Sequence, residues 1–394
     1  MPEEKPRSPT GEYIITTVGD EEVHAFVPAP LPPDPPLNID GAMIAALDAA
    51  SWALGRFDGA IRYLPNKGLL IYSYVRKEAV LSSQIEGTQS SLSDLMQHEL
   101  ETAPGTPLDD VEEVSTYVAA VEHAYRQMTD PSGLPLCNRL LREAHGILLS
   151  TGRGADKRPG EFRTSQNWIG GSRPGTAAFV PPPAPEAHQA ISALEKFLHA
   201  EDDHLPPLMR AGLAHVQFET IHPFLDGNGR IGRMLITLLL CDREVLSTRA
   251  FYPSLYFKHH RSDYYDLLNR VRTEGVWNEW LLFFLEGIRS TAETALETTQ
   301  RLETMAANDR GLIGERAGRS ASSALRVHAT LMERPVLNVE TSSQLSGLSW
   351  PAVNNAMTRL CVLGIASEVT GQRRNRVFKY SEYLKVLEEG TEPL

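Results

Sequence analysis

The chain has few cysteines, no long apolar run and no excess of positive charge. Its three cysteines, Cys137, Cys241 and Cys361, are far apart and lack the spacing of a zinc site. We therefore expect no disulfide framework, and a reducing cytoplasm is the simplest location. The longest apolar run, from Met234 to Cys241, is far shorter than the ~20 residues that span a membrane, so no membrane partner is expected.

The scarcity of positive charge also limits the class of partner. The formal net charge is −12, which argues against a general coating of nucleic acid, because such binding depends on clustered lysine and arginine. A local basic patch remains compatible with this balance. With 42% hydrophobic and 22% charged residues over 394 positions, the chain has the composition of a globular protein of two or three domains.

Hydrophobic periodicity predicts a mainly helical protein. A proline-rich segment, Pro28 to Pro36, favours an extended arm at the start of the chain. Apolar residues then recur at helical spacing from Asp40 to about Glu99 and again from Asp110 to Met128. We divide the chain into an arm (1–38), an N-terminal helical region (39–130), a helical core (131–305) and a small C-terminal domain (306–394).

Within the core, one segment has a different texture. From Gly160 to Pro183 two short strand-like runs flank a turn rich in glycine, serine and proline, which predicts a hairpin between helices. The predicted helices around it are Cys137 to Leu149, Glu186 to Ala200, Pro207 to Thr220, one from Arg230 onward, Ser262 to Arg272, and Asn278 to about Met305.

The C-terminal block follows a predicted break at Ala306 to Gly314. A helical turn at Ser343 to Leu345 and a helix from Trp350 to Leu363, capped by Ser349, precede two strands. These strands, Ile365 to Val369 and Val377 to Tyr380, complete the pattern of a winged helix-turn-helix. Its basic residues could contact DNA; they are Arg359, Arg373, Arg374, Arg376 and Lys379. Alternatively, the wing could only dock against the rest of the chain or against a second copy.

The segment Ile221 to Arg233 combines chemical groups that core loops rarely hold together. Its Gly227-Asn228-Gly229 turn tolerates positive φ, so backbone N–H groups can converge on an anion at the start of the next helix. The guanidiniums of Arg230 and Arg233, three residues apart, can both reach a polyphosphate. The segment therefore predicts a phosphate-binding turn.

Two further side chains of this segment supply reactive groups. Asp226 offers an oxygen ligand suited to Mg²⁺. His222 titrates near neutral pH and can accept a proton from a hydroxyl that attacks phosphorus. A lone histidine is more often structural, but here base, anion cradle and metal ligand occur in one stretch.

The motif His222-Pro-Phe-Leu-Asp-Gly-Asn-Gly-Arg-Ile-Gly-Arg233 resembles the full signature of Fic domains. This resemblance implies a Fic-fold helical bundle with a β-hairpin flap and a Fic catalytic core at 131–305. It implies an adenylyltransferase that moves AMP from ATP to a hydroxyl of a protein, itself included, with Mg²⁺ present and pyrophosphate released. His222 would be the base, Asp226 the metal ligand and Arg233 the partner of the γ-phosphate. The α- and β-phosphates would lie on Gly227, Asn228, Gly229 and Arg230.

The resemblance covers approximately Pro28 to Glu286. It implies that the hairpin is the flap on which a target segment docks by strand addition, through Asn167, Trp168, Ile169 and Gly170. It also implies that Tyr264 and Tyr265 line the adenine side, although adjacent tyrosines on a helix equally fit a half-buried helix face. Where some relatives have asparagine this chain has Arg272, which leaves the ribose and adenine contacts open. A homodimer is expected from the resemblance alone.

Upstream, Ser82, Glu86 and Gly87 resemble the inhibitory Fic motif (Ser/Thr)-x-x-x-Glu-(Gly/Asn). By itself, a serine with a glutamate one helical turn later is an ordinary surface feature. The resemblance implies that Glu86 pairs with Arg233 and displaces the γ-phosphate, which keeps activity low. Some relatives with this motif also remove AMP, and the sequence leaves that activity open.

Two classes of function remain in competition, and transfer of another nucleotide or phosphate-linked group is a third possibility. The first is a protein adenylyltransferase whose winged domain regulates it or recruits its target. The second is a transcription regulator that binds DNA through the winged domain and uses the Fic fold to sense a nucleotide.

Overall fold

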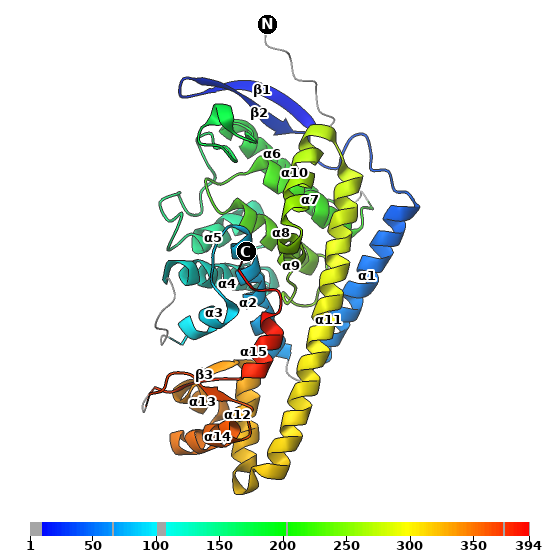
Figure 1. Cartoon of the computed structure of the whole chain (residues 1–394). Coiled ribbons are helices and arrows are strands. Elements are labelled where there is room, and N and C mark those ends of the chain that lie inside the picture. The colour runs from blue at the N-terminus through cyan, green and yellow to red at the C-terminus, as the bar shows by residue number, and fades with distance from the viewer. Residues whose placement is uncertain (1–9, 65–66, 101–107, 202–203, 373–374, 394) are drawn as a thin grey trace. The chain divides into compact units, whose positions relative to one another are not determined.

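The structure is a computed structural model of the chain, and it describes residues 10–64, 67–100, 108–201, 204–372 and 375–393. These residues are mainly helical, as predicted (Figure 1). None of the described helices is both long and apolar enough to cross a membrane. The chain divides into two compact units: residues 1–55, 116–249 and 256–291 form the first, and residues 56–115, 250–255 and 292–394 form the second.

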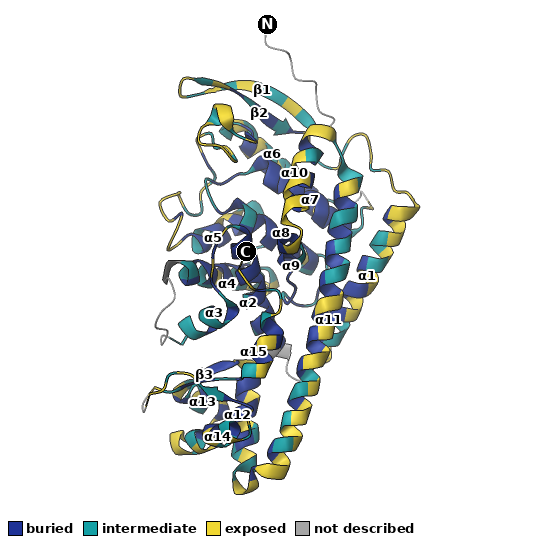
Figure 2. Ribbon diagram, in the orientation of Figure 1, coloured by how far each residue is buried: buried dark blue, intermediate teal, exposed yellow. Residues whose placement is uncertain are grey.

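The first unit is built around two helices that are buried along almost their whole length (Figure 2). These are α7 (Pro207–Ile221) and α8 (Asn228–Asp242), and α7 also packs against α6 and α10. Helices that are apolar on most faces are stable only when other elements surround them. The other helices of this unit are α5 (Asn138–Leu148), α6 (Ala184–His199) and α10 (Arg261–Glu274), while α1 (Gly41–Arg62), α4 (Leu108–Thr129), α9 (Ser254–His259) and α11 (Trp277–Arg316) belong to both units.

The N-terminal arm contains a β-hairpin that the sequence analysis did not anticipate. Strands β1 (Gly11–Val18) and β2 (Glu21–Pro28) pair antiparallel, with Gly11 opposite Pro28 and Val18 opposite Glu21. The signal was present, because β-branched residues flank a Gly-Asp turn in which Gly19 has a φ of 62°. The proline-rich stretch that follows favoured an extended arm over a hairpin.

The predicted flap hairpin is reduced to a single bridge. Ile169 and Phe179 exchange both backbone hydrogen bonds, at 2.8 and 3.1 Å, and the 3₁₀ turn η1 (Pro174–Thr176) closes the loop between them. The backbone of the N-terminal hairpin supports the flap, because the N–H of Phe26 donates to the carbonyl of Val180 at 2.9 Å.

The second unit contains the C-terminal block. Its sheet has the order β3-β5-β4, and β3 was not predicted. The order of helix, turn, helix and hairpin follows the predicted winged pattern, and that assignment stays a prediction. Its elements are α2 (Lys67–Ile85), α3 (Leu92–His98), η2 (Gly318–Ser320), α12 (Ala321–Glu333), β3 (Val336–Asn338), α13 (Val339–Ser346), α14 (Trp350–Val362), β4 (Ser367–Glu368), β5 (Val377–Lys379) and α15 (Ser381–Glu388).

Two details of the C-terminal prediction are wrong. The expected break at Ala306 to Gly314 lies inside α11, which continues to Arg316. Isolated glycines cost a helix only about 1 kcal/mol each, and Ala306 and Ile313 are buried one above the other on the same helix face. Ser349 precedes α14, but its side chain makes no capping hydrogen bond.

A glycine in α7 permits close packing against α11. The indole N–H of Trp280 donates to the carbonyl of Gly212 at 2.9 Å, and a Cβ at position 212 would meet Leu281 at 2.9 Å and Phe284 at 3.0 Å. We predict that Gly212→Ala lowers the free energy of unfolding by about 1–3 kcal/mol, because it overpacks the core. Urea denaturation measures this change.

Gly55→Ala is the matched control, since a Cβ there meets nothing within 4 Å and the residue lies in a helix. It should raise stability by about 0.5–1 kcal/mol, because glycine is a poor helix former. Equal effects of the two substitutions would contradict the packing argument.

Candidate active site

The predicted catalytic motif begins where α7 ends. His222 caps this helix with φ 50° and ψ 60°, the left-handed region that residues other than glycine rarely adopt. The side chain of His222 is half-buried, whereas those of His145 and His215 are fully buried. Strained backbone of this kind is concentrated at functional sites, and the partial exposure leaves the imidazole within reach of a ligand.

The turn after His222 is closed by one side chain. The amide of Asn228 accepts a hydrogen bond from the N–H of Phe224 and donates one to the carbonyl of Phe224, both at 2.9 Å. The Phe224 ring is fully buried and stacks on the His145 ring, with centroids 3.7 Å apart. The side chain of Asn228 therefore shapes the turn, and its backbone N–H remains the group that can face an anion.

The start of α8 is the place where the sequence predicts an anion site. Gly227 has a φ of 74° and lies directly before the first residue of α8, Asn228. The N–H groups of Asn228, Gly229 and Arg230 occupy the first turn, where an α-helix leaves donors without intrahelical acceptors. The helix dipole adds partial positive charge at the same place, so this end of α8 suits a phosphate group.

Asp226 is the one motif carboxylate available to a metal. Its Oδ1 accepts the Gly227 N–H at 2.6 Å. Within the described ranges, no three or more histidine, cysteine or acidic side chains lie together so that they could hold a metal ion. Mg²⁺ is commonly bound through one or two carboxylates together with water and substrate phosphates. The donor set therefore fits a magnesium ion that arrives with a nucleotide.

His145 of α5 holds this turn and was missed by sequence reasoning. Its Nδ1 accepts the Gly160 N–H at 2.9 Å, so its Nε2 carries the proton and donates to the carbonyl of Asp226 at 3.0 Å. Burial lowers the pKa of His145 from 6.5 to about 4, and the charge of Arg230 contributes to the shift. Nothing in the helix pattern around His145 distinguishes it from an ordinary core histidine.

The motif arginines and the flap lie in the same unit as His222. Arg230 and Arg233 are both buried, with 1% of their surface exposed. In the flap, the Asn167 amide donates to the carbonyl of Phe224 at 3.0 Å, which joins the flap directly to the catalytic turn. Trp168 is partly exposed, and Gly170 has a φ of 69°.

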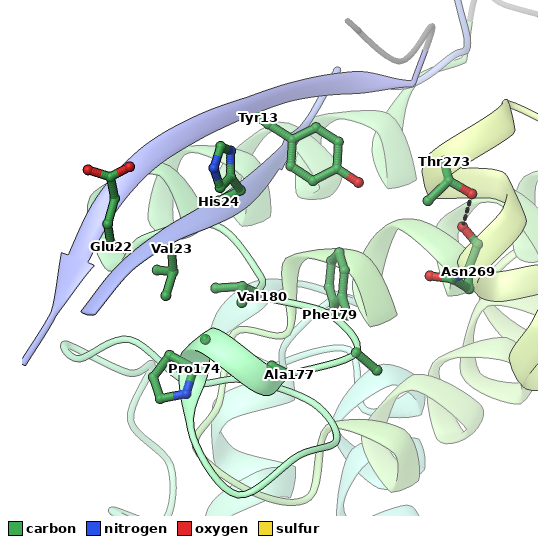
Figure 3. A pocket seen from close by; sticks show the side chains of 12 residues that line it. Tyr13, Glu22, Val23, His24, Pro174, Ala177, Phe179, Val180, Asn269 and Thr273 are labelled. Atoms are coloured by element: carbon green, nitrogen blue, oxygen red, sulfur yellow. Dashed lines mark hydrogen bonds between the residues drawn. The ribbon is translucent and has the colours of Figure 1, made fainter. Parts of the chain in front are cut away.

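A cavity of about 280 Å³ lies between the N-terminal hairpin and the flap (Figure 3). The hairpin and the flap are joined near it by the Phe26–Val180 backbone bond and by Glu21, which pairs with Arg173 at 2.7 Å and accepts the Gly175 N–H at 2.8 Å. No residue of the catalytic motif lines the cavity, so it is a feature of the flap. Its wall includes Tyr13, Glu22, His24, Phe179, Asn269 and Thr273.

Comparison with known proteins identifies the family. Residues 44–126 match the N-terminal part of the Fic/DOC family, and residues 135–240 match the Fic/DOC family itself. The chain contains a Fic domain, preceded by a Fic/DOC N-terminal part. The second range contains His145, the flap, His222 and the phosphate-binding turn, so the geometry described above is that of its Fic domain.

Relatives and solved structures agree with this assignment. The chain is 31% identical over 223 residues to a protein adenylyltransferase Fic from Culex quinquefasciatus, which covers 55% of this chain and 41% of that protein. The protein of the same name from Aedes aegypti is 34% identical over 145 residues, or 36% of this chain and 26% of that protein. The chain thus spans less than half the length of these relatives.

The fold is shared with solved Fic structures. A Fic family protein from Desulfovibrio desulfuricans aligns with a TM-score of 0.57 and 19% identity, covering 88% of this chain and 97% of that chain. A Fic domain containing signaling protein from Bacteroides thetaiotaomicron aligns with a TM-score of 0.51 and 19% identity, covering 64% of this chain and 95% of that one. At this identity the likeness concerns the fold.

The segment predicted to be inhibitory lies in the second unit, within the match to the Fic/DOC N-terminal part. Ser82 is fully buried in α2, and Glu86 follows the last residue of that helix. Gly87 has a φ of 102°, which favours glycine. The Gln84 amide donates to the carbonyls of Ser90 at 3.0 Å and Thr391 at 2.8 Å, so residues near the end of the chain hold this turn.

The two tyrosines of α10 differ in their surroundings. Tyr264 is buried, and its hydroxyl bonds to His215 at 2.8 Å, whereas Tyr265 is 42% exposed. Arg272, also buried, donates to the Thr220 hydroxyl at 3.1 Å and lies 4.0 Å above the Phe179 ring of the flap. This packing favours a core role for Tyr264, and an adenine contact stays a prediction.

The buried His215 links stability of the Fic domain to pH. Its Nδ1 donates to the carbonyl of Gly232 at 2.9 Å, so its Nε2 accepts the Tyr264 hydroxyl hydrogen. Burial lowers the pKa of His215 from 6.5 to about 3. Below pH 6.5 the unfolded state binds a proton that the folded state refuses until about pH 3. The contribution of neutral His215 to the free energy of unfolding is therefore complete above pH 6.5. It falls by about 1.4 kcal/mol for each pH unit below 6.5.

We predict that His215→Gln flattens the dependence of the unfolding free energy on pH between 6.5 and 5. Urea denaturation at several pH values measures this slope. The same change at His260, whose side chain is 44% exposed, should leave the slope unaltered. An unchanged slope in His215→Gln would contradict the assigned neutral state.

Proposed function

We propose that this protein transfers AMP from ATP to a hydroxyl of a protein. The observation that carries the proposal is a strained, half-buried His222 beside the open first turn of α8. The names of the relatives from Culex quinquefasciatus and Aedes aegypti, protein adenylyltransferase Fic, support the same reaction class. A base adjacent to a phosphate cradle is the arrangement that phosphoryl-type transfer requires.

The roles of the residues follow from their positions. The ATP phosphates would lie on the N–H groups of residues 228–230, with Arg230 and Arg233 balancing their charge. His222 would take the proton of the attacking hydroxyl as its oxygen bonds to the α-phosphorus. The bond from that phosphorus to the bridging oxygen breaks, and pyrophosphate leaves. Magnesium held by Asp226 would supply further charge stabilisation to the phosphates.

His222→Ala tests the base. We expect label transfer from α-labelled ATP to protein to fall by about 10²- to 10⁴-fold, because a positioned base contributes that much, while ATP affinity changes little. Exposed His204 also has positive φ, at 50°, so His204→Ala is a matched control that should transfer label normally. Transfer from γ-labelled ATP in place of α-labelled ATP would mean phosphoryl transfer and would overturn the proposal.

We also propose that Glu86 inhibits this reaction, as the resemblance of Ser82, Glu86 and Gly87 to the inhibitory Fic motif implies. The position of Glu86, on a tightly held turn within the match to the Fic/DOC N-terminal part, supports this role. A charge-assisted bond is worth about 1.5–3 kcal/mol, which corresponds to about 10- to 100-fold in activity. Removal of AMP by the same site remains a further activity to test.

Glu86→Gly should therefore raise AMP incorporation by about 10- to 100-fold, measured with α-labelled ATP and cell lysate protein. Glu244→Gly makes the same replacement at an exposed residue with φ 55° and should have no effect. Equal or lower incorporation in Glu86→Gly would rule out the inhibitory role and leave the transfer reaction itself standing.

The alternative, a DNA-binding regulator, gains no support from the described wing. The guanidinium of Arg359 donates to the carbonyl of Arg316, and that of Arg376 lies 4.8 Å from the centre of the Phe378 ring. Arg373 and Arg374 lie outside the described residues. Sequence-selective DNA retardation without label transfer would favour the alternative.

A cytoplasmic location and a homodimer belong to the same proposal. The free thiols of Cys137, Cys241 and Cys361 are compatible with a reducing compartment. The homodimer rests on the resemblance to Fic proteins, and light scattering would test it.

A further inference from the structure

One buried arginine connects the catalytic turn to the flap. The Arg163 side chain has no exposed surface. Its Nε donates to the carbonyl of His222 at 2.9 Å, and its Nη2 donates to the carbonyl of Ile221 at 3.3 Å. The same guanidinium also donates to Ser165 at 3.2 Å and to Pro182, again through carbonyl oxygens.

These four carbonyls come from two structures that must be aligned. Ile221 and His222 form the end of α7 and the catalytic turn, whereas Ser165 and Pro182 lie at the two ends of the flap. The backbone adds a fifth bond, from the N–H of Arg163 to the carbonyl of Pro223 at 2.9 Å. The Arg163 side chain therefore helps to fix the position of the flap relative to His222.

Burying the charged Arg163 side chain costs free energy, which points to a use for its position. Burial lowers the pKa of the Arg163 guanidinium to about 10, so the group is still charged at neutral pH. Among the described residues no carboxylate forms an ion pair with it, and carbonyl oxygens alone offset the loss of water. Only a planar guanidinium fork can reach carbonyls on both sides at once, which lysine cannot do.

We propose that Arg163 is a positioning residue that sets the distance between a target segment docked on the flap and the imidazole of His222. This inference rests on the proposed AMP transfer to a protein. The nucleotide would be held by other groups, the first turn of α8 and its arginines, so Arg163 acts on the use of the protein acceptor and not on ATP binding. A second link, from the Asn167 amide to the carbonyl of Phe224 at 3.0 Å, serves the same alignment.

The test uses Arg163→Lys in the full chain, in the Glu86→Gly background and beside its parent. Each reaction contains α-labelled ATP and cell lysate protein. Two products are measured: AMP bound to protein, and free AMP formed when water is the acceptor. Water needs no flap, so the ratio of bound to free AMP should fall by about 10- to 100-fold, the loss that a misplacement of about 1 Å produces. The affinity for a non-hydrolysable ATP analogue should stay within about threefold of the parent, well under one tenfold step of about 1.4 kcal/mol.

Arg158→Lys is the matched control, since Arg158 is an exposed arginine on the same segment that donates to the Thr164 hydroxyl at 2.8 Å. It should leave the ratio unchanged. If Arg163→Lys lowers bound and free AMP in parallel, or abolishes binding of the analogue, Arg163 is merely structural and the proposal fails. Should Arg163→Lys not fold, Asn167→Leu removes the second link and should lower the ratio in the same direction.

Hydrogen exchange separates this proposal from the proposed reaction. The amides of Ile169 and Phe179 close the flap bridge, and they should exchange faster in Arg163→Lys than in Arg158→Lys while the amides of α8 do not. Unchanged flap exchange overturns the anchoring role, whatever the activity. Absence of any protein-bound label in the parent would instead overturn the reaction.

Discussion

Two fully buried helices have to be joined by a turn that leaves one imidazole accessible, and the rest of the Fic domain depends on how that turn is closed. The amide of Asn228 satisfies both backbone groups of Phe224, so a short connection can be buried without unpaired polar groups. His222 then adopts a left-handed conformation at the end of α7. The same turn ends at Gly227, directly before the first N–H groups of α8.

Aromatic packing and buried guanidiniums maintain this turn from outside. The Phe224 ring lies on His145, and His145 holds the backbone of Asp226. Arg163 binds the carbonyls at the end of α7, while Arg272 bonds Thr220, the residue before Ile221, and lies over the flap ring of Phe179. Removing either cation would leave buried carbonyls without donors, a cost of about 1–3 kcal/mol for each group. A substitution of Arg163 would therefore disturb the flap and the catalytic turn together.

The second unit places the predicted inhibitory segment among residues that are distant in sequence. Gln84 bonds the backbone of Thr391, and the ammonium of Lys77 bonds the backbone carbonyl of Glu389 at 2.8 Å. Glu388 accepts the N–H of Ser93 at 3.0 Å, at the start of α3. The turn that carries Glu86 thus rests partly on the end of α15, and its stability is coupled to the C-terminal block.

The sequence by itself determined the local features: most helices, the glycine turn at the start of α8 and the place of His222 before it, because periodicity, glycine conformation and residue spacing act over a few positions. It also predicted the flap, which the structure reduces to one bridge, and the two C-terminal helices followed by two strands, but not β3. The break at Ala306 to Gly314 was wrong, since burial of Ala306 and Ile313 outweighs the helix-breaking tendency of two glycines. Only the tertiary structure decided that His145 and Arg163 hold the catalytic turn and that Tyr264 is buried. The reason is physical: these roles depend on partners far along the chain, which local propensity cannot specify.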